Sequence, residues 1–294
     1  MKKIIDSLGS YSYSKGRDFS LVFEDLLDWL IATFDVANVH KHKLDYSALF
    51  EERKEDNPVF FEVLVRWAQM TVEGVSKEGS FDFFGTMYEE VVKGKFKSSA
   101  MGQFFTPLPL CKLMGELVFK TQDVTINDCA CGSGRTLLGH WALTDKAKFH
   151  YYVGEDLDLV CVKMCALNFM MNGMIGLVVH HDALAQDFLG AYEVNEIKWP
   201  FPNPACSIRK LNEAQYQSRI QWLVARAKGK SIKQKCEFVM PPPQPEDVQE
   251  CVKIEHKVVE PPVAGPAEAP IKPIQAQAQA GRPIQLSLFN LDEL

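Results

Sequence analysis

Between residues 123 and 184 the chain alternates short apolar segments with helical ones, and this alternation constrains the fold more than any other feature. The segments DVTINDCA, HYYVGEDLD and GLVVHHDAL predict strands, while TLLGHWAL and LVCVKMCALNFMMNG between them predict helices. Strands connected by helices usually pair in parallel, because each helix carries the chain back along the sheet. We therefore predict an α/β fold with a doubly wound, Rossmann-like sheet, either complete or truncated.

The preceding residues have a helical pattern. Apolar residues recur at helical spacing between Val22 and Phe34, and Pro58 suits the first turn of a second helix. A third helix is expected to carry Phe84 and Val91 and to stop near Gly94. The chain is thus predicted to have a helical region over residues 1–98 and an α/β domain over residues 99–236.

The composition changes after about residue 236. Ten of the sixteen prolines lie from Pro241 onward, among them those of PPPQP, and IQAQAQA follows. Such composition is typical of disordered linkers. Residues 237–294 are therefore predicted to form a disordered tail, which ends in the short apolar peptide QLSLF.

Composition and charge exclude several classes of protein. No run reaches the roughly 18 apolar residues of a membrane span, and no long apolar segment follows the basic start MKKIIDSLGS. A cytoplasmic protein is therefore expected. The eight cysteines lack zinc-ribbon spacing, so we expect reduced thiols and no metal site. The net charge of −6 argues against a protein that coats nucleic acid.

The charge is nevertheless uneven. Residues 209–235 contain eight basic residues and the single acid Glu213. This stretch either follows the phosphates of a nucleic acid or forms a helix with a solvated basic face.

Four short motifs follow one another in the α/β region. They are GQFFTP (Gly102 to Pro107), DCACGSG (Asp128 to Gly134), GEDLD (Gly154 to Asp158) and HDAL (His181 to Leu184). The glycines of the second motif let the backbone approach a ligand closely at the carboxyl end of a strand. An acid after the next strand can accept both hydroxyls of a ribose.

In this order the four motifs resemble the N6-adenine DNA methyltransferases, in particular the modification subunits of type I restriction-modification systems. The resemblance covers residues 80–206 and includes the segment DFFGTMYE (Asp82 to Glu89). It implies S-adenosylmethionine as cofactor, adenine in duplex DNA as substrate and a specificity subunit as partner. The family usually has proline where Cys129 stands.

The resemblance also implies the residues that bind the cofactor. They are Phe105, Thr106, Asp128, Cys131, Gly132, Gly134, Asp156, Leu157, Asp182 and Leu184. Gly132 and Gly134 would contact the methionine part and Asp156 the ribose, with Asp158 as the alternative acid.

At the other end of the cofactor, Asp182 would accept from the adenine amino group, and Leu157 and Leu184 would pack against the ring. Thr106 and the aromatic residue before it would close over the methionine end. Phe104 and Phe105 could instead be core residues.

The catalytic motif of the family is degenerate in this chain. The family places Asn-Pro-Pro-aromatic after its fourth strand, where the asparagine side chain and a proline carbonyl accept from the target amine and the aromatic stacks on the flipped base. The nearest match is Asn203-Pro204-Ala205-Cys206, 21 residues after Asp182. This segment is either the catalytic loop, with Asn203 and Pro204 as its acceptors, or an ordinary proline-rich loop.

The tail peptide QLSLF resembles the motif by which bacterial proteins dock on the DNA polymerase sliding clamp. Gln285 would make amide hydrogen bonds, and three apolar residues would anchor the peptide, namely Leu286, Leu288 and Phe289. The alternative is a segment that folds back onto the globular part.

Two functions remain open at this point. The first is an adenine-specific DNA methyltransferase, either solitary or dependent on a specificity subunit. The second is a degenerate relative that binds S-adenosylmethionine or DNA without turnover, as a regulatory or decoy subunit.

Overall fold

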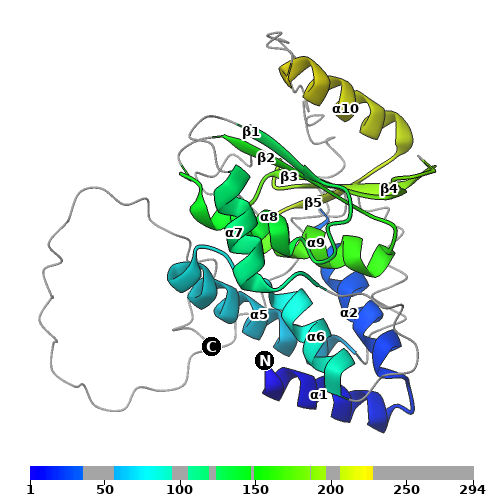
Figure 1. The fold of residues 1–294 in the computed structure, drawn as a ribbon. Helices are drawn as coiled ribbons and strands as arrows, with labels where there is room; N and C mark the ends of the chain where they lie inside the picture. The colour runs from blue at the N-terminus through cyan, green and yellow to red at the C-terminus, as the bar shows by residue number, and fades with distance from the viewer. Residues whose placement is uncertain are drawn as a thin grey trace, which may run out of the picture. The chain divides into compact units, whose positions relative to one another are not determined.

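A mixed five-stranded sheet forms the centre of the protein (Figure 1). The computed structural model describes residues 1–35, 56–94, 105–118, 124–146, 149–185, 187–196 and 206–227. The strands lie in the order of the chain, and they are β1 (Val124–Asp128), β2 (His150–Asp156), β3 (Gly176–Asp182), β4 (Asp187–Val194) and β5 (Ile208–Leu211). The first three strands are parallel, and β4 and β5 are antiparallel to their neighbours.

The α/β class predicted from the alternating pattern is confirmed, but the sheet is not purely parallel. The hairpin from β3 into β4 was not predicted, nor was β5. Among the described strands the order does not reverse, and β1 has a neighbour on one side only. The doubly wound arrangement is therefore not shown by the described part of the chain.

Helices cover both faces of the sheet. The helices α8 (Arg135–Leu143) and α9 (Leu159–Met171) lie on one face, and α10 (Glu213–Ala227) lies on the other (Figure 1). Ten residues of α9 are buried, because this helix is enclosed between the sheet and the N-terminal helices. An apolar helix without a polar face is the expected solution for such a position.

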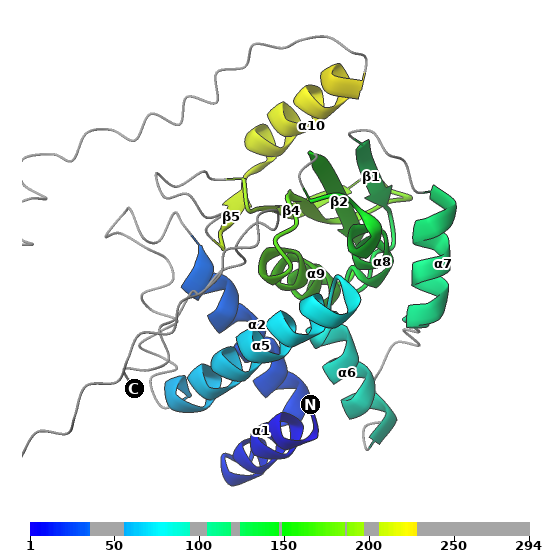
Figure 2. The same cartoon turned by 90° about the vertical axis from the view of Figure 1, so that its left-hand side faces the viewer.

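The N-terminal helices form a further layer beyond α9, and both views agree on this arrangement (Figure 2). They are α1 (Lys2–Ser14), α2 (Phe19–Phe34), α5 (Asn57–Glu78) and α6 (Phe83–Gly94). The predicted helix start at Pro58 is confirmed. The described part of α6 ends at Gly94, the last residue before an undescribed stretch, so the predicted stop stays a prediction. The helix α1 lies within the region predicted to be helical but was not predicted as a separate helix. Aromatic rings hold this layer together, and the centroids of Trp67 and Phe84 are 4.9 Å apart in an edge-to-face contact.

One hydrophobic core extends from the N-terminal helices through α9 to the sheet. The described residues belong to one compact unit, Met1–Ser231, and Ile232–Leu294 lie outside the described ranges. The three-part division predicted from composition stays a prediction. No helix in the described ranges is both long enough and apolar enough to cross a membrane.

The helix α7 (Leu108–Val118) joins the segment after GQFFTP to the sheet layer by packing on α8. The two helices touch through glycines. A Cβ atom added to Gly139 would lie 2.7 Å from the carbonyl oxygen of Cys111, and one added to Gly115 would lie 2.9 Å from the backbone nitrogen of His140. This contact fixes α7 against the middle of α8, the helix that begins where the glycine turn ends.

Candidate cofactor site

The glycine turn connects the end of β1 to the start of α8. Gly132 and Gly134 have φ angles of +55° and +84°, which residues with a Cβ atom rarely adopt. A Cβ atom on Gly132 would also lie 2.8 Å from the ring of Phe105. The turn therefore needs glycine at position 132 both for its backbone conformation and for the space that Phe105 occupies.

Two carboxylates at neighbouring strand ends hold this turn in place. Asp128 ends β1 and accepts from the backbone nitrogen of Ala130 at 3.1 Å and from the Thr136 hydroxyl. Asp156 ends β2 and accepts from the backbone nitrogens of Gly132, at 2.8 Å, and Asp158, at 2.9 Å. The parallel register brings the two strand ends together, so Asp156 reaches back across the sheet to the turn.

A pocket opens beside the turn. It is lined by Phe105, Thr106, Ala130, Cys131, Gly132, Arg135, Thr136, Asp156 and Cys161. Five of the residues predicted to bind the cofactor belong to this set, namely Phe105, Thr106, Cys131, Gly132 and Asp156. Sequence reasoning missed the other four, namely Ala130, Arg135, Thr136 and Cys161.

The other five predicted residues lie outside the lining of this pocket. Asp128 stabilises the turn through its hydrogen bonds with Ala130 and Thr136. Gly134 is packed against α9, because a Cβ atom there would lie 2.8 Å from the sulfur of Cys165. Leu157 and Leu184 are 62% and 96% exposed. Asp182 accepts from the backbone nitrogens of Leu184 and Ala185, which lowers the pKa of its carboxyl group.

The predicted catalytic and partner-binding residues fall outside the described ranges. This holds for Asn203 and Pro204, and equally for Gln285, Leu286, Leu288 and Phe289. Their roles remain predictions.

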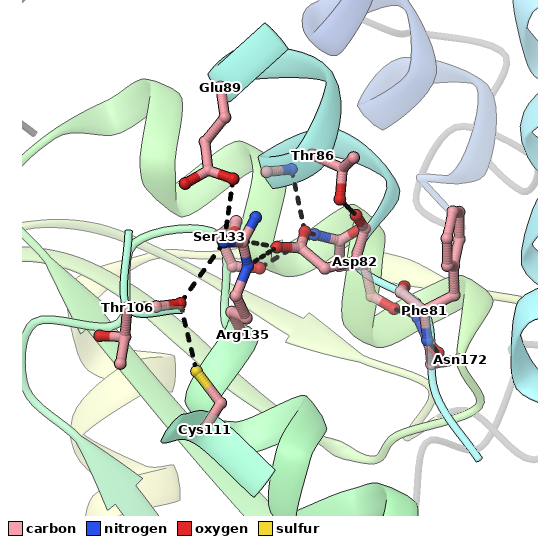
Figure 3. Close-up of polar contacts among 11 residues, drawn as sticks. Phe81, Asp82, Thr86, Glu89, Thr106, Cys111, Ser133, Arg135 and Asn172 are labelled. Atoms are coloured by element: carbon pink, nitrogen blue, oxygen red, sulfur yellow. Dashed lines mark hydrogen bonds and ion pairs between the residues drawn. The ribbon is translucent and has the colours of Figure 1, made fainter. Parts of the chain in front are cut away.

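Behind the turn lies a buried polar cluster that sequence reasoning did not identify (Figure 3). Asp82, just before α6, accepts from the Ser133 hydroxyl at 2.8 Å and from Nε of Arg135 at 2.6 Å. Its second oxygen accepts from the backbone nitrogen of Gly85 at 2.9 Å and from the Asn168 amide at 2.7 Å. One carboxylate thus connects α6, the glycine turn, α8 and α9.

Arg135 extends this cluster toward the pocket (Figure 3). Its Nη1 donates to Glu89 at 3.1 Å and to the carbonyl oxygen of Thr106 at 3.4 Å, and its guanidinium lies 5.4 Å from the centroid of the Phe105 ring. Burial alone would lower the pKa of Arg135, but Asp82 and Glu89 raise it overall. The guanidinium is therefore a fixed positive charge. The signal available in the sequence was DFFGTMYE, which contains both acids.

The cysteines near the pocket are buried thiols. A hydrogen bond with Cys165, together with burial, raises the pKa of Cys131 well above its ordinary value, and burial raises the pKa of Cys161. Both are therefore protonated at neutral pH and act as small apolar groups. The described cysteines are all free, as expected for reduced thiols.

Part of the basic stretch is neutralised within the fold. Arg209 and Arg219 both bind the buried carboxylate of Glu193, and Arg219 also lies 2.8 Å from Glu196. Arg226 stacks over Phe149 with its guanidinium 4.2 Å from the ring centroid. These three cations are engaged by the protein, and they do not form a free surface for phosphates.

A glycine turn after one parallel strand and an acid after the next form the edge at which α/β proteins bind their ligands. A model of the N-6 DNA methylase family matches residues 79–240, more than half of the chain. The chain belongs to this family, which confirms the resemblance inferred from the four motifs.

One curated relative is the type I restriction enzyme MjaVIII methylase subunit of Methanocaldococcus jannaschii. It is 31% identical to this chain over 98 residues, which are 33% of this chain and 17% of the relative. The alignment therefore spans about a sixth of the relative's length. A comparison with solved structures gives no significant match.

Proposed function

We propose that the protein is an S-adenosylmethionine-dependent DNA methyltransferase that transfers a methyl group to the N6 amine of adenine. The observation that carries this proposal is the contact of Asp156 with the glycine turn. Its carboxylate lines the pocket and is held by the backbone nitrogen of Gly132. Each of its oxygens retains a lone pair with which to accept a ribose hydroxyl.

The pocket also fits the methionine part of this cofactor. Gly132 lines the pocket together with Thr106, so a ligand in the pocket can lie against the backbone of the turn. Asp182 would accept from the adenine amino group, and the exposed Leu157 and Leu184 would be covered by the adenine ring. The family membership of the chain supports a Rossmann-like completion of the sheet.

S-adenosylmethionine supplies an electrophilic methyl group on a sulfonium sulfur. The remaining task of the protein is to hold the target amine in line with that methyl group. The side chain of Asn203 and the carbonyl oxygen of Pro204 would each accept a hydrogen bond from the target amine. These two bonds would raise the electron density on the amine nitrogen. The amine nitrogen would take the methyl group while the sulfur leaves as a neutral thioether, and the methylated amine would release one proton to solvent.

A second candidate function is cofactor or DNA binding without turnover. The observation that favours it is that β1 lacks a strand on its second side in the described sheet, since α/β sheets bind substrates where the strand order reverses. The loop also has Ala205 and Cys206 in place of the second proline and the aromatic. Loss of base stacking would cost about 1–3 kcal/mol.

DNA and a specificity subunit are the partners proposed for this function, which places the protein in the cytoplasm.

The tail peptide around Leu288 and Phe289 is proposed to dock on a sliding clamp. A labelled peptide of residues 281–294 should bind purified clamp, and changing both residues to alanine should abolish that binding. Equal binding by the two peptides would refute the docking role.

The test of the proposed function is methyl transfer from labelled cofactor to duplex DNA, with and without a candidate specificity subunit. The enzyme is expected to label N6 of adenine, and Asn203→Ala is expected to abolish labelling while cofactor binding persists. Cofactor binding without labelling under both conditions would favour the non-catalytic function. Unchanged labelling by Asn203→Ala would show that this loop is not the active site.

A further inference from the structure

The Arg135 side chain lines the pocket although it is only 5% exposed. Its Nε donates to Asp82, and its Nη1 donates to Glu89 and to the carbonyl oxygen of Thr106. Its Nη2 is buried and has no acceptor among the described residues. A buried guanidinium nitrogen without an acceptor is unfavourable, so a ligand acceptor that comes within hydrogen-bond distance of Nη2 would relieve this cost.

The surroundings of Arg135 fix its guanidinium rather than merely neutralise it. Asp82 is 1% exposed and is itself held by Gly85, Ser133 and Asn168. The carbonyl of Thr106 accepts from the same guanidinium (Figure 3). The ring centroid of Phe105, the preceding residue, lies 5.4 Å from that guanidinium. A side chain held on several sides loses little entropy when it binds a ligand.

A carboxylate is the group that best fits this nitrogen. Guanidinium nitrogens form short, charge-assisted bonds with carboxylates. Arg135 is also the first residue of α8, and the positive end of the helix dipole favours an anion there. Asp156 lines the same pocket and offers acceptors instead of donors, so the pocket has an anion-binding and a hydroxyl-binding part.

We propose that Nη2 of Arg135 binds the α-carboxylate of S-adenosylmethionine, the one anionic group of that molecule, and that Asp82 is the residue that positions Arg135. This inference rests on the proposed function, because it names the contact that orients the same cofactor. Arg135 then selects the amino-acid end of the ligand as Asp156 selects its ribose.

The test compares S-adenosylmethionine with decarboxylated S-adenosylmethionine, which keeps the adenosine, the sulfonium and the amine. Calorimetry is performed with the unmutated 294-residue chain and with Arg135→Gln. The substitution should weaken S-adenosylmethionine binding by about tenfold or more, the loss expected for one charge-assisted hydrogen bond, and should change binding of the decarboxylated ligand much less. Equal weakening of both ligands would overturn the proposal.

Two further variants keep the test decisive if Arg135→Gln does not fold. Arg135→Lys keeps the charge but removes Nη2. It should still lower the affinity for S-adenosylmethionine more than the affinity for the decarboxylated ligand. Glu89→Gln removes one of the two acids facing the guanidinium. It should raise the affinity for S-adenosylmethionine relative to the affinity for the decarboxylated ligand. If both variants left the ratio of the two affinities unchanged, Arg135 would not contact the carboxylate.

Asp82→Asn distinguishes positioning from packing. It should lower the affinity for S-adenosylmethionine selectively, and a loss that is equal for both ligands would assign Asp82 a purely structural role and overturn its positioning role. Failure of the unmutated protein to bind either ligand would instead reject the proposed function, and this inference with it. Binding of both ligands with no selectivity in the Arg135 variants would reject this inference alone.

Discussion

Nε of Arg135 lies 2.6 Å from a carboxylate oxygen of Asp82, and both side chains are almost completely buried. The two residues are 53 positions apart in the chain. Asp82 precedes α6 in the N-terminal helical layer, while Arg135 starts the helix after the glycine turn. This ion pair therefore couples the packing of the N-terminal helices to the shape of the candidate cofactor pocket.

Removing one partner of this pair should be strongly destabilising. Asp82→Ala would leave the Arg135 charge buried and deprived of its main partner, and we expect a loss of about 3–5 kcal/mol in the free energy of unfolding. Asp82→Ala combined with Arg135→Met should cost less than the sum of the single changes, by about 0.5–3 kcal/mol. Urea denaturation measures each value.

The matched control is the exposed pair of Glu62 and Arg66, one helical turn apart on α5. Glu62→Ala should change the unfolding free energy by less than about 1 kcal/mol. Similar losses for Asp82→Ala and Glu62→Ala would show that the buried cluster has no special role.

A second prediction separates the two acids of GEDLD. Asp156→Ala should weaken cofactor binding tenfold or more, about 1.4 kcal/mol, because the hydrogen bonds to the ribose are lost and the turn at Gly132 loses its acceptor. Asp158 caps α9 by accepting from the backbone nitrogen of Val160. Asp158→Ala should therefore cost about 0.5–2 kcal/mol of stability without affecting affinity.

Calorimetry and thermal unfolding measure these two effects on the same samples. If Asp158→Ala weakened binding and Asp156→Ala did not, Asp158 would be the acid that contacts the ribose.

The features that could be predicted from sequence are those specified by a few adjacent residues. Pro58 marks a helix start by its own backbone preference, and the turn at Gly132 follows a strand within a single motif. Asp156 could be predicted for the same reason, because its position at the end of a strand is local information. The pocket then follows from parallel pairing of the two strands.

The features that were missed depend on distant partners. The strand Asp187–Val194 pairs antiparallel with β3, and its partner β5 is short and charged, with Arg209 bound to Glu193 of the neighbouring strand. The helix Lys2–Ser14 contains serine and tyrosine at positions where strong helix formers are usual, and it is held by burial of Ile4 and Leu8. The role of Arg135 depends on Asp82 and could not be deduced from spacing.

A third prediction concerns the contact between α7 and α8. Alanine normally stabilises a helix relative to glycine by about 1 kcal/mol, but a Cβ atom at Gly139 would lie 2.7 Å from a backbone oxygen of α7. We expect Gly139→Ala to destabilise the protein by about 1–3 kcal/mol through overpacking. Gly9 on α1 has no atom within 4 Å of its added Cβ, so Gly9→Ala should stabilise by about 0.5–1 kcal/mol.

Urea denaturation of the two glycine variants at the same pH measures these changes. Opposite signs would support the close packing of α7 on α8, whereas stabilisation by both would show that the two helices are not in contact at Gly139.

The last prediction concerns pH. His140 is 1% exposed and its Nδ1 lies 3.0 Å from the Tyr152 hydroxyl. Burial, with smaller contributions from His150 and Lys146, lowers the pKa of His140 from 6.5 to about 4. Between these values the unfolded chain binds a proton that the folded protein does not, so the free energy of unfolding falls as pH falls through this window.

The contribution of one such group is at most about 1.4 kcal/mol per pH unit. His140→Gln removes this group, so the variant should lose stability less steeply than the unmutated protein between pH 6.5 and pH 4.5. Urea denaturation of both proteins at several pH values measures the two slopes, and groups that titrate in both proteins cancel in the difference. Equal slopes would show that His140 becomes protonated in the folded protein as readily as in the unfolded chain.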